Sequence, residues 1–343
     1  MRVHGLSWKD SGGHEEPTTE GKDIKYIGRY MNDVMGVEFK LWDRRMIHDS
    51  LTSDNSVRNC DVLLIQMFTI IRYGGTLSKW DAEVCDLINH FDGPVVLYIN
   101  DQSYYKFLKN ISKPKWGDMA VTRPIYLADD RPELYKILAD SKTNIAGHLR
   151  LNQSWAYAWL WKRDPEHMRQ LLDEPVKPKH DFIYGGLTRG RNFNRRLDSI
   201  FSVFGVENCI SYGQVAERWG MEDLSKSWGL NFARPEQLME LNSSCRFSAL
   251  PYDKDKNYIT TRCFEQGFTD CLVLCDEGYN QEDCGFPVVD YLDKDAVAAY
   301  RDMPETERIK AVKAQHERLA AIDYGQKCAY MMDGFFKGIG LKV

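Results

Sequence analysis

The chain has 343 residues, a net charge of −5, 43% hydrophobic residues and 28% charged residues. This length is too great for one small core, so two domains are expected, and the composition is typical of a folded globular protein. No apolar run reaches the roughly 18 residues of a membrane helix and no signal-peptide core follows Met1, which predicts a cytoplasmic protein without a membrane partner. Nine cysteines without a CxxC pair indicate reduced core thiols and argue against a disulfide framework or a metal site.

Short apolar runs alternate with amphipathic stretches in the first half of the chain. Strands are predicted at residues 37–42, 61–68 and 94–100, and helices at 24–35 and 77–91. This order predicts βαβ units with a parallel sheet. The apolar runs do not alternate strictly with polar residues, which indicates strands covered on both faces.

The second half repeats this alternation after a polar, proline-containing segment at 161–180, which is a predicted hinge. Strands are predicted at 182–184, 209–212, 247–250, 271–275 and 287–291, and helices from Arg195, Glu236 and Thr261 and at 305–324 and 325–336. The predicted fold class is α/β, with two doubly wound, Rossmann-like domains facing a central cleft at the strand carboxyl ends. No GxGxxG follows the first strand and no GxxxxGK[ST] occurs, which argues against a dinucleotide dehydrogenase and a P-loop NTPase.

Two segments of the second half have the residues that a nucleoside diphosphate requires. A predicted strand runs into the turn Gly185-Gly186, with Arg189 just beyond it, and a later helix start places Arg262 and Glu265 on one face, three residues apart. Backbone N–H groups of such a turn can approach phosphate oxygens, two guanidinium groups can neutralise a diphosphate, and a carboxylate can accept both ribose hydroxyls. The alternative is a glycine turn with surface arginines that binds nothing.

Positive charge is concentrated in two stretches despite the negative total. Residues 177–196 contain six lysines and arginines against Asp181. Residues 106–123 contain five against Asp118, with Phe107 and Trp116 interleaved and Tyr104 and Tyr105 just before them. Cations with aromatic planes suit a polyanion that carries bases, such as nucleic acid. The alternative is a solvated, lysine-rich loop.

Several short segments match one known family in chain order. They are residues 17–20, 61–65, 73–75, 95–101, 123–124, 181–186 with Arg189, 259–262 with Glu265, and 276–277. With these segments the chain resembles the DNA β-glucosyltransferases of T-even bacteriophages, which have the GT-B fold and transfer glucose from UDP-glucose to 5-hydroxymethylcytosine in duplex DNA. The resemblance implies an acceptor (DNA) domain at 1–170, a UDP-sugar domain at 171–320, and a helix at 321–343 that returns to the first domain. It also implies a monomer in the cytoplasm of an infected bacterial host.

The resemblance implies a catalytic base at Asp101, which ends the predicted strand at 94–100. A carboxylate there would face the cleft and take the proton of the attacking hydroxyl in an inverting displacement. The alternative is a turn residue. Glu20 and Asp253 match acidic residues that the family holds beside the donor sugar, although Glu20 also fits a helix-capping box, and Arg234 lies in the segment that would read the nucleobase.

The remaining roles that the resemblance implies concern DNA and the diphosphate. DNA would contact Tyr73, Gly74, Gly75, Lys113, Lys115 and Arg123, and flipping of the target base is expected because the transfer cannot occur inside the stack. The diphosphate would contact Gly185, Gly186, Arg189, Arg191 and Arg262, with Glu265 on the ribose.

Departures from the family leave parts of the function open. The second phosphate arginine of the family is Phe193 here, and Arg191, Arg195 or Arg196 could replace it; a serine of the family is Leu187. The sugar remains open, and the acceptor is 5-hydroxymethylcytosine or 5-hydroxymethyluracil. No acidic DxD-like cluster is convincing as a metal site, so Mg²⁺ or Mn²⁺ would be only loosely bound. Two rival functions are a GT-B glycosyltransferase with a small-molecule or glycan acceptor, which the negative charge favours, and a non-catalytic nucleic-acid-binding protein, which an intact Asp101 disfavours.

Overall fold

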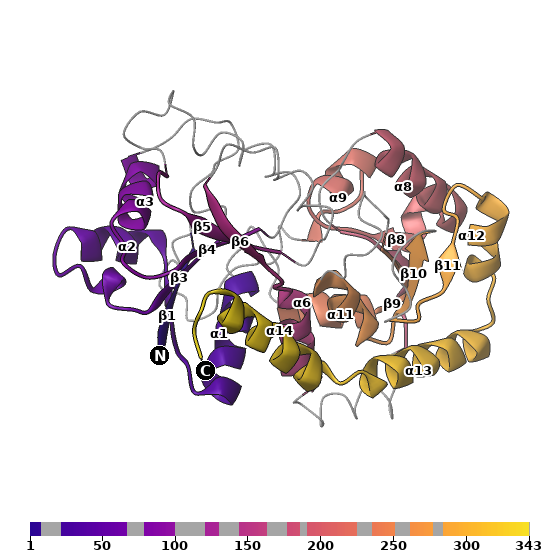
Figure 1. Cartoon of the computed structure of the whole chain (residues 1–343). Helices are drawn as coiled ribbons and strands as arrows, with labels where there is room; N and C mark the ends of the chain where they lie inside the picture. The colour runs from indigo at the N-terminus through magenta and orange to yellow at the C-terminus, as the bar shows by residue number, and fades with distance from the viewer. Residues whose placement is uncertain are drawn as a thin grey trace. The chain divides into compact units, whose positions relative to one another are not determined.

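The computed structural model describes residues 1–7, 22–66, 79–99, 121–129, 144–162, 177–185, 191–224, 235–250, 261–276 and 284–342. The chain forms two compact units (Figure 1). The first contains Met1–Leu160 and Tyr324–Val343, and the second contains Trp161–Asp323. Each unit contains a parallel sheet with helices, which confirms the predicted α/β class. No helix within these ranges is both long enough and apolar enough to cross a membrane.

The first unit contains a six-stranded parallel sheet with the strand order β2-β1-β3-β4-β5-β6. The strands are β1 Arg2–Leu6, β2 Glu38–Trp42, β3 Val62–Gln66, β4 Val95–Tyr98, β5 Ile125–Ala128 and β6 Ile145–Leu149. Every residue of β3 and β4 is buried. The sequence predicted this burial, because apolar runs without alternation are typical of strands covered on both faces.

The helices of the first unit include one from the carboxyl end of the chain. They are α1 Lys22–Met35, α2 Arg44–Leu51, the 3-10 turn η1 Ser56–Arg58, α3 Lys79–Asn89, α6 Gln153–Lys162 and α14 Tyr324–Gly338. The hydroxyl of Tyr30 in α1 donates to the carbonyl of Gly325 in α14 at 3.2 Å, and the amide of Asn152 donates to the sulfur of Met331 at 2.9 Å. Figure 1 shows α14, in yellow, beside α1, in indigo.

The second unit contains a five-stranded parallel sheet with the order β11-β10-β9-β7-β8. The strands are β7 His180–Ile183, β8 Cys209–Ile210, β9 Cys245–Leu250, β10 Leu272–Asp276 and β11 Val288–Val289. The helices are α8 Arg191–Phe204, η5 Val206–Asn208, α9 Gln214–Trp219, α10 Pro235–Ser243, α11 Thr261–Gly267, α12 Lys294–Arg301 and α13 Glu305–Ala321. The order places β9 in the middle of the sheet with β7 beside it, so the carboxyl ends of these two strands lie near the centre of the carboxyl edge.

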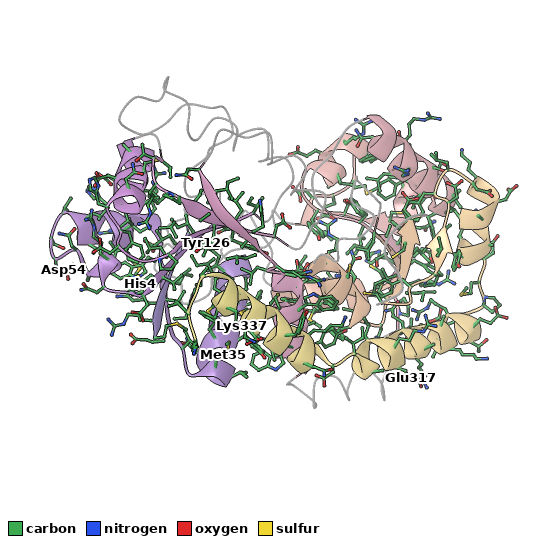
Figure 2. The ribbon with its side chains drawn as sticks, in the orientation of Figure 1. His4, Met35, Asp54, Tyr126, Glu317 and Lys337 are labelled. Carbon is green, nitrogen blue, oxygen red and sulfur yellow. The ribbon has the colours of Figure 1, made fainter. Side chains whose placement is uncertain are left out.

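The sequence analysis missed β1, β5 and β6, together with helices α2, α6, α9 and α12. β1 is hard to predict because Arg2–Leu6 contains a histidine and a glycine, both uncommon in central strands. Packing stabilises both residues here. His4 is buried with its Nδ1 2.8 Å from the carbonyl oxygen of Val57 (Figure 2), and a Cβ on Gly5 would overlap the ring of Phe39.

A network of ion pairs holds α13 against the amino-terminal ends of β7 and β9. The guanidinium of Arg246, in β9, lies 3.2 Å from a carboxylate oxygen of Asp181 in β7 and 3.5 Å from one of Glu305. Arg308 is fully buried and pairs with Glu305 at 2.7 Å. Glu317, on the opposite face of the same helix, points away from the unit (Figure 2). The network stabilises the amino-terminal edge of the sheet and does not involve the carboxyl edge.

Candidate functional site

The candidate site lies at the carboxyl ends of β7 and β8 in the second unit. β7 is followed by Tyr184 and Gly185, and β8 by Ser211 and Tyr212. The amide of Tyr184 donates to the carbonyl of Ile210 at 3.3 Å, and the hydroxyl of Ser211 donates to the carbonyl of Tyr184. The backbone of Tyr184 is therefore bonded to the neighbouring strand on both sides of its Cα, which fixes where its side chain begins.

Gly185 is required here by close packing. A Cβ at this position would overlap the ring of Tyr212. The ring of Tyr212 therefore lies directly over the glycine, and any side chain at residue 185 would displace it. Sequence reasoning assigned Gly185 to phosphate binding. The structure adds a packing reason for the same residue.

Arg262 lies in the first turn of α11 and its guanidinium lies on Tyr184. Its Nη1 donates to the phenol oxygen of Tyr184 at 3.1 Å, and its Cζ lies 5.3 Å from the centroid of that ring. The side chain is half-buried, yet within the described parts of the chain Arg262 forms no ion pair. A half-buried guanidinium that is held only by a neutral phenol keeps most of its N–H donors available for an anion.

The electrostatics of this cluster keep Arg262 charged and Tyr212 neutral. Burial acts against the charge of Arg262, but Tyr184, Tyr212 and Glu265 outweigh it and raise the pKa of the guanidinium. Burial also raises the pKa of Tyr212 to about 12, with Arg262 opposing the shift and Glu265 adding to it. The phenol of Tyr212 is therefore unable to neutralise the arginine at physiological pH.

Glu265 lies on α11 one turn after Arg262, as the i, i+3 spacing predicted. It is half-buried, and its charge contributes to the raised pKa of both Arg262 and Tyr212. A cation and a carboxylate that lie one helical turn apart can bind the phosphate and the hydroxyl groups of one ligand.

The three arginines that could supply a second phosphate contact differ in the structure. Arg196, in α8, pairs with Asp276 at the end of β10, with Nε 2.8 Å from Oδ2 and the carboxylate only 2% exposed. Arg195 is exposed, and Arg191 begins α8 with a side chain outside the described part of the molecule. Arg196 therefore already has a buried carboxylate as its partner.

Arg123 is the one predicted DNA contact whose position is described. Its guanidinium donates to the carbonyl of Gly93 at 2.9 Å and to that of Ile88 at 3.4 Å. The residue precedes β5, at the amino-terminal edge of the first sheet. These bonds attach the start of β5 to α3 and the segment before β4, so the structure gives Arg123 a stabilising contact and adds no support for its predicted role with DNA.

The other predicted site residues lie outside the described residues. They are Glu20, Tyr73, Gly74, Gly75, Asp101, Lys113, Lys115, Gly186, Arg189, Arg234 and Asp253. Asp101 follows the end of β4 by three residues, and β4 lies between β3 and β5 in the middle of the first sheet. Sequence reasoning overlooked Tyr184 and Tyr212. The available signal was an aromatic residue at the end of two successive predicted strands of the second domain.

Comparison with known proteins places the chain among glycosyltransferase folds. No family model matches the chain, and no curated protein sequence matches it. A T4 phage BGT (β-glucosyltransferase) mutant in complex with UDP-glucose is 17% identical, covers 99% of this chain and 100% of its own, and has a TM-score of 0.65. The T4 phage enzyme with UDP and Mn²⁺ has the same identity and coverage and a TM-score of 0.64. Anabaena Alr3699/HepE with UDP-glucose is 8% identical, covers 97% of this chain and 99% of its own, and has a TM-score of 0.54. These likenesses confirm the GT-B fold and, at the level of the fold, the resemblance to the phage enzyme.

Proposed function

We propose that the protein is an inverting glycosyltransferase that moves a sugar, with glucose as the first candidate, from a UDP-sugar to the hydroxymethyl group of a modified pyrimidine in duplex DNA. The observation that carries the donor part is Arg262, a half-buried cation without an ion pair among the described residues, at the carboxyl edge of the second sheet. UDP-sugar donors fit the site because their diphosphate and ribose can be bound by a cation and a carboxylate that lie one helical turn apart. Similar folds have been solved with UDP or UDP-glucose, which supports this choice.

In the proposed donor complex, residues of the second unit bind the diphosphate and the ribose of UDP. Arg262 contacts the diphosphate and stabilises the charge that develops on UDP as it leaves, together with Arg189 and backbone N–H groups at Gly185 and Gly186. Glu265 accepts the ribose hydroxyls. A loosely held Mg²⁺ or Mn²⁺ would add positive charge beside the leaving diphosphate.

The acceptor half of the proposal rests on the sequence resemblance. Asp101 removes the proton of the hydroxymethyl group, the oxygen attacks the anomeric carbon, and the bond from that carbon to UDP breaks on the opposite face, which inverts the configuration. The target base leaves the duplex stack to reach the sugar. Glu20 and Asp253 are proposed to lie beside the sugar, and Arg234 beside the uracil.

DNA contacts are proposed for the basic and aromatic stretch 106–123 and for the segment 73–75. Lys113 and Lys115 would neutralise backbone phosphates, which fixes the register of the duplex without reading its sequence.

A glycosyltransferase with a small-molecule or glycan acceptor is the second candidate. The net charge of −5 favours it, because a DNA-binding surface gains from a positive field. It would use the same Arg262 and Glu265 and would not need the basic stretch. The two candidates therefore share the donor site and differ in the acceptor.

One experiment separates them. The protein is incubated with a panel of UDP-sugars and with plain, 5-hydroxymethylcytosine or 5-hydroxymethyluracil DNA, and the DNA is then digested to nucleosides for mass analysis. A new glycosylated nucleoside is expected with one donor and one modified DNA, and it should be absent with Asp101→Asn under the same conditions. Hydrolysis of a UDP-sugar without any modified nucleoside would favour the small-acceptor enzyme, and no reaction with any donor would refute both candidates.

A further inference from the structure

Tyr184 contacts the guanidinium of Arg262 and can therefore determine where the positive charge of the site lies. Its backbone is bonded to β8 through its own amide and through the hydroxyl of Ser211. Its side chain is 3% exposed, so the phenol has few alternative positions. The ring and its hydroxyl are therefore fixed before any ligand arrives.

Two different contacts join this fixed ring to Arg262. The hydroxyl oxygen accepts a hydrogen bond from Nη1, and the ring itself lies under the guanidinium. A hydrogen bond alone fixes the distance of the guanidinium, while the ring contact also restricts the plane in which its N–H donors lie. Together they select one orientation of a long side chain that otherwise has many rotamers.

The second tyrosine of the cluster, Tyr212, packs on the glycine that follows Tyr184. The ring of Tyr212 lies over Gly185, where an added Cβ would overlap it. A larger residue at 185 would displace Tyr212 and change the surroundings of the arginine. Tyr184 is therefore the member of the cluster that contacts the guanidinium through both its hydroxyl and its ring.

We infer that Tyr184 is a positioning residue that holds the guanidinium of Arg262 in the orientation in which it binds the diphosphate of the donor. This inference rests on the function proposed above for the same site. Its physical basis is preorganisation, because a cation already fixed in its binding orientation loses less conformational freedom when the ligand binds. The role is specific to the phosphates and should not extend to the nucleoside.

The test is a double-mutant cycle measured by titration calorimetry with UDP and with uridine. Tyr184→Phe keeps the ring and its packing and removes only the hydroxyl. We expect the Kd for UDP to rise about 5- to 10-fold, the effect of losing one ordinary hydrogen bond, because the arginine itself remains, and the Kd for uridine to stay unchanged. In an Arg262→Ala background the same substitution should change the Kd for UDP less than about twofold, since its effect acts through the arginine.

The matched control is Tyr291→Phe, which removes another buried phenol hydroxyl of the second unit, one that donates to the carbonyl of Leu274. It should leave both Kd values unchanged. A Tyr184→Phe variant that binds UDP like the parent, that weakens uridine equally, or that loses as much affinity without Arg262 would overturn the positioning role alone. If the parent protein binds no UDP, the donor site fails, and the positioning role fails with it.

Discussion

Replacement of Arg262 by alanine tests whether this arginine serves a ligand or the fold. In the folded protein it has one recorded hydrogen bond, to the neutral phenol of Tyr184, and no ion pair within the described parts of the chain. Its removal should therefore change the free energy of unfolding by no more than about 1 kcal/mol, the usual net value of one hydrogen bond. Burial of the charge is outweighed by its interactions with Tyr184, Tyr212 and Glu265, so the melting temperature should stay the same or fall slightly.

The effect on UDP binding should be much larger. A hydrogen bond to a charged group contributes about 1.5–3 kcal/mol, so the Kd for UDP should rise about 10- to 150-fold. Titration calorimetry measures the affinity, and thermal unfolding of the same variant measures the stability. The predicted result combines lost affinity with retained stability.

Arg246→Ala is the matched control for this prediction. Arg246 is also a partly buried arginine of the second unit, but it pairs with Asp181 and Glu305. Its removal leaves the partly buried carboxylate of Asp181 without its arginine and should lower the free energy of unfolding by about 1–3 kcal/mol, with UDP affinity unchanged. A folded Arg262→Ala protein that binds UDP as the parent does, or that is destabilised as strongly as Arg246→Ala, would refute the assignment of Arg262 to the donor.

Three further predictions concern the base, the DNA surface and the fold. Asp101→Asn should leave UDP affinity unchanged and reduce transfer about 10²- to 10⁴-fold in a single-turnover assay; transfer within threefold of the parent would exclude it as the base. Lys113 and Lys115 changed together to alanine should flatten the decline of DNA affinity with salt without affecting UDP, and an unchanged slope would remove them from the interface. The hydrogen bond from Arg308 lowers the pKa of Glu305, so that carboxylate stabilises the fold above its ordinary pKa of 4.5 and the contribution is lost as the pH falls through the lower folded value. Urea unfolding between pH 7 and 3 should show the decline, and Glu305→Gln should reduce it.

Three of the strands that the sequence predicted correctly share one property. β3, β4 and β10 are buried along their whole length, and an apolar run covered on both faces is visible without knowledge of its neighbours. β1 is equally central but includes His4 and Gly5, whose suitability depends on Val57 and Phe39. Such a strand is stabilised by contacts distant in sequence, which local patterns do not contain.

The candidate site likewise contains residues that local sequence patterns predict and contacts between residues distant in sequence that they do not. Arg262 and Glu265 were predicted because their spacing on one helix is a local property. The bond between Arg262 and Tyr184 joins residues 78 positions apart, and the packing of Tyr212 on Gly185 depends on the pairing of β7 with β8. Residues that share one helix could be predicted as a site from the sequence. The contacts that orient their side chains come from other strands, and these contacts could be identified only once the strand order was known.

The contrast between Arg196 and Arg262 gives the strongest physical reason to place ligand chemistry at the second of them. Both lie near the carboxyl edge of the second sheet, and both are partly buried. Arg196 pairs with Asp276, a carboxylate that is 2% exposed. Arg262 donates to the phenol oxygen of Tyr184, a contact that orients the cation and is not an ion pair. A second cation for the diphosphate should therefore be sought at Arg189, Arg191 or Arg195, because an anion at Arg196 would compete with the buried carboxylate of Asp276.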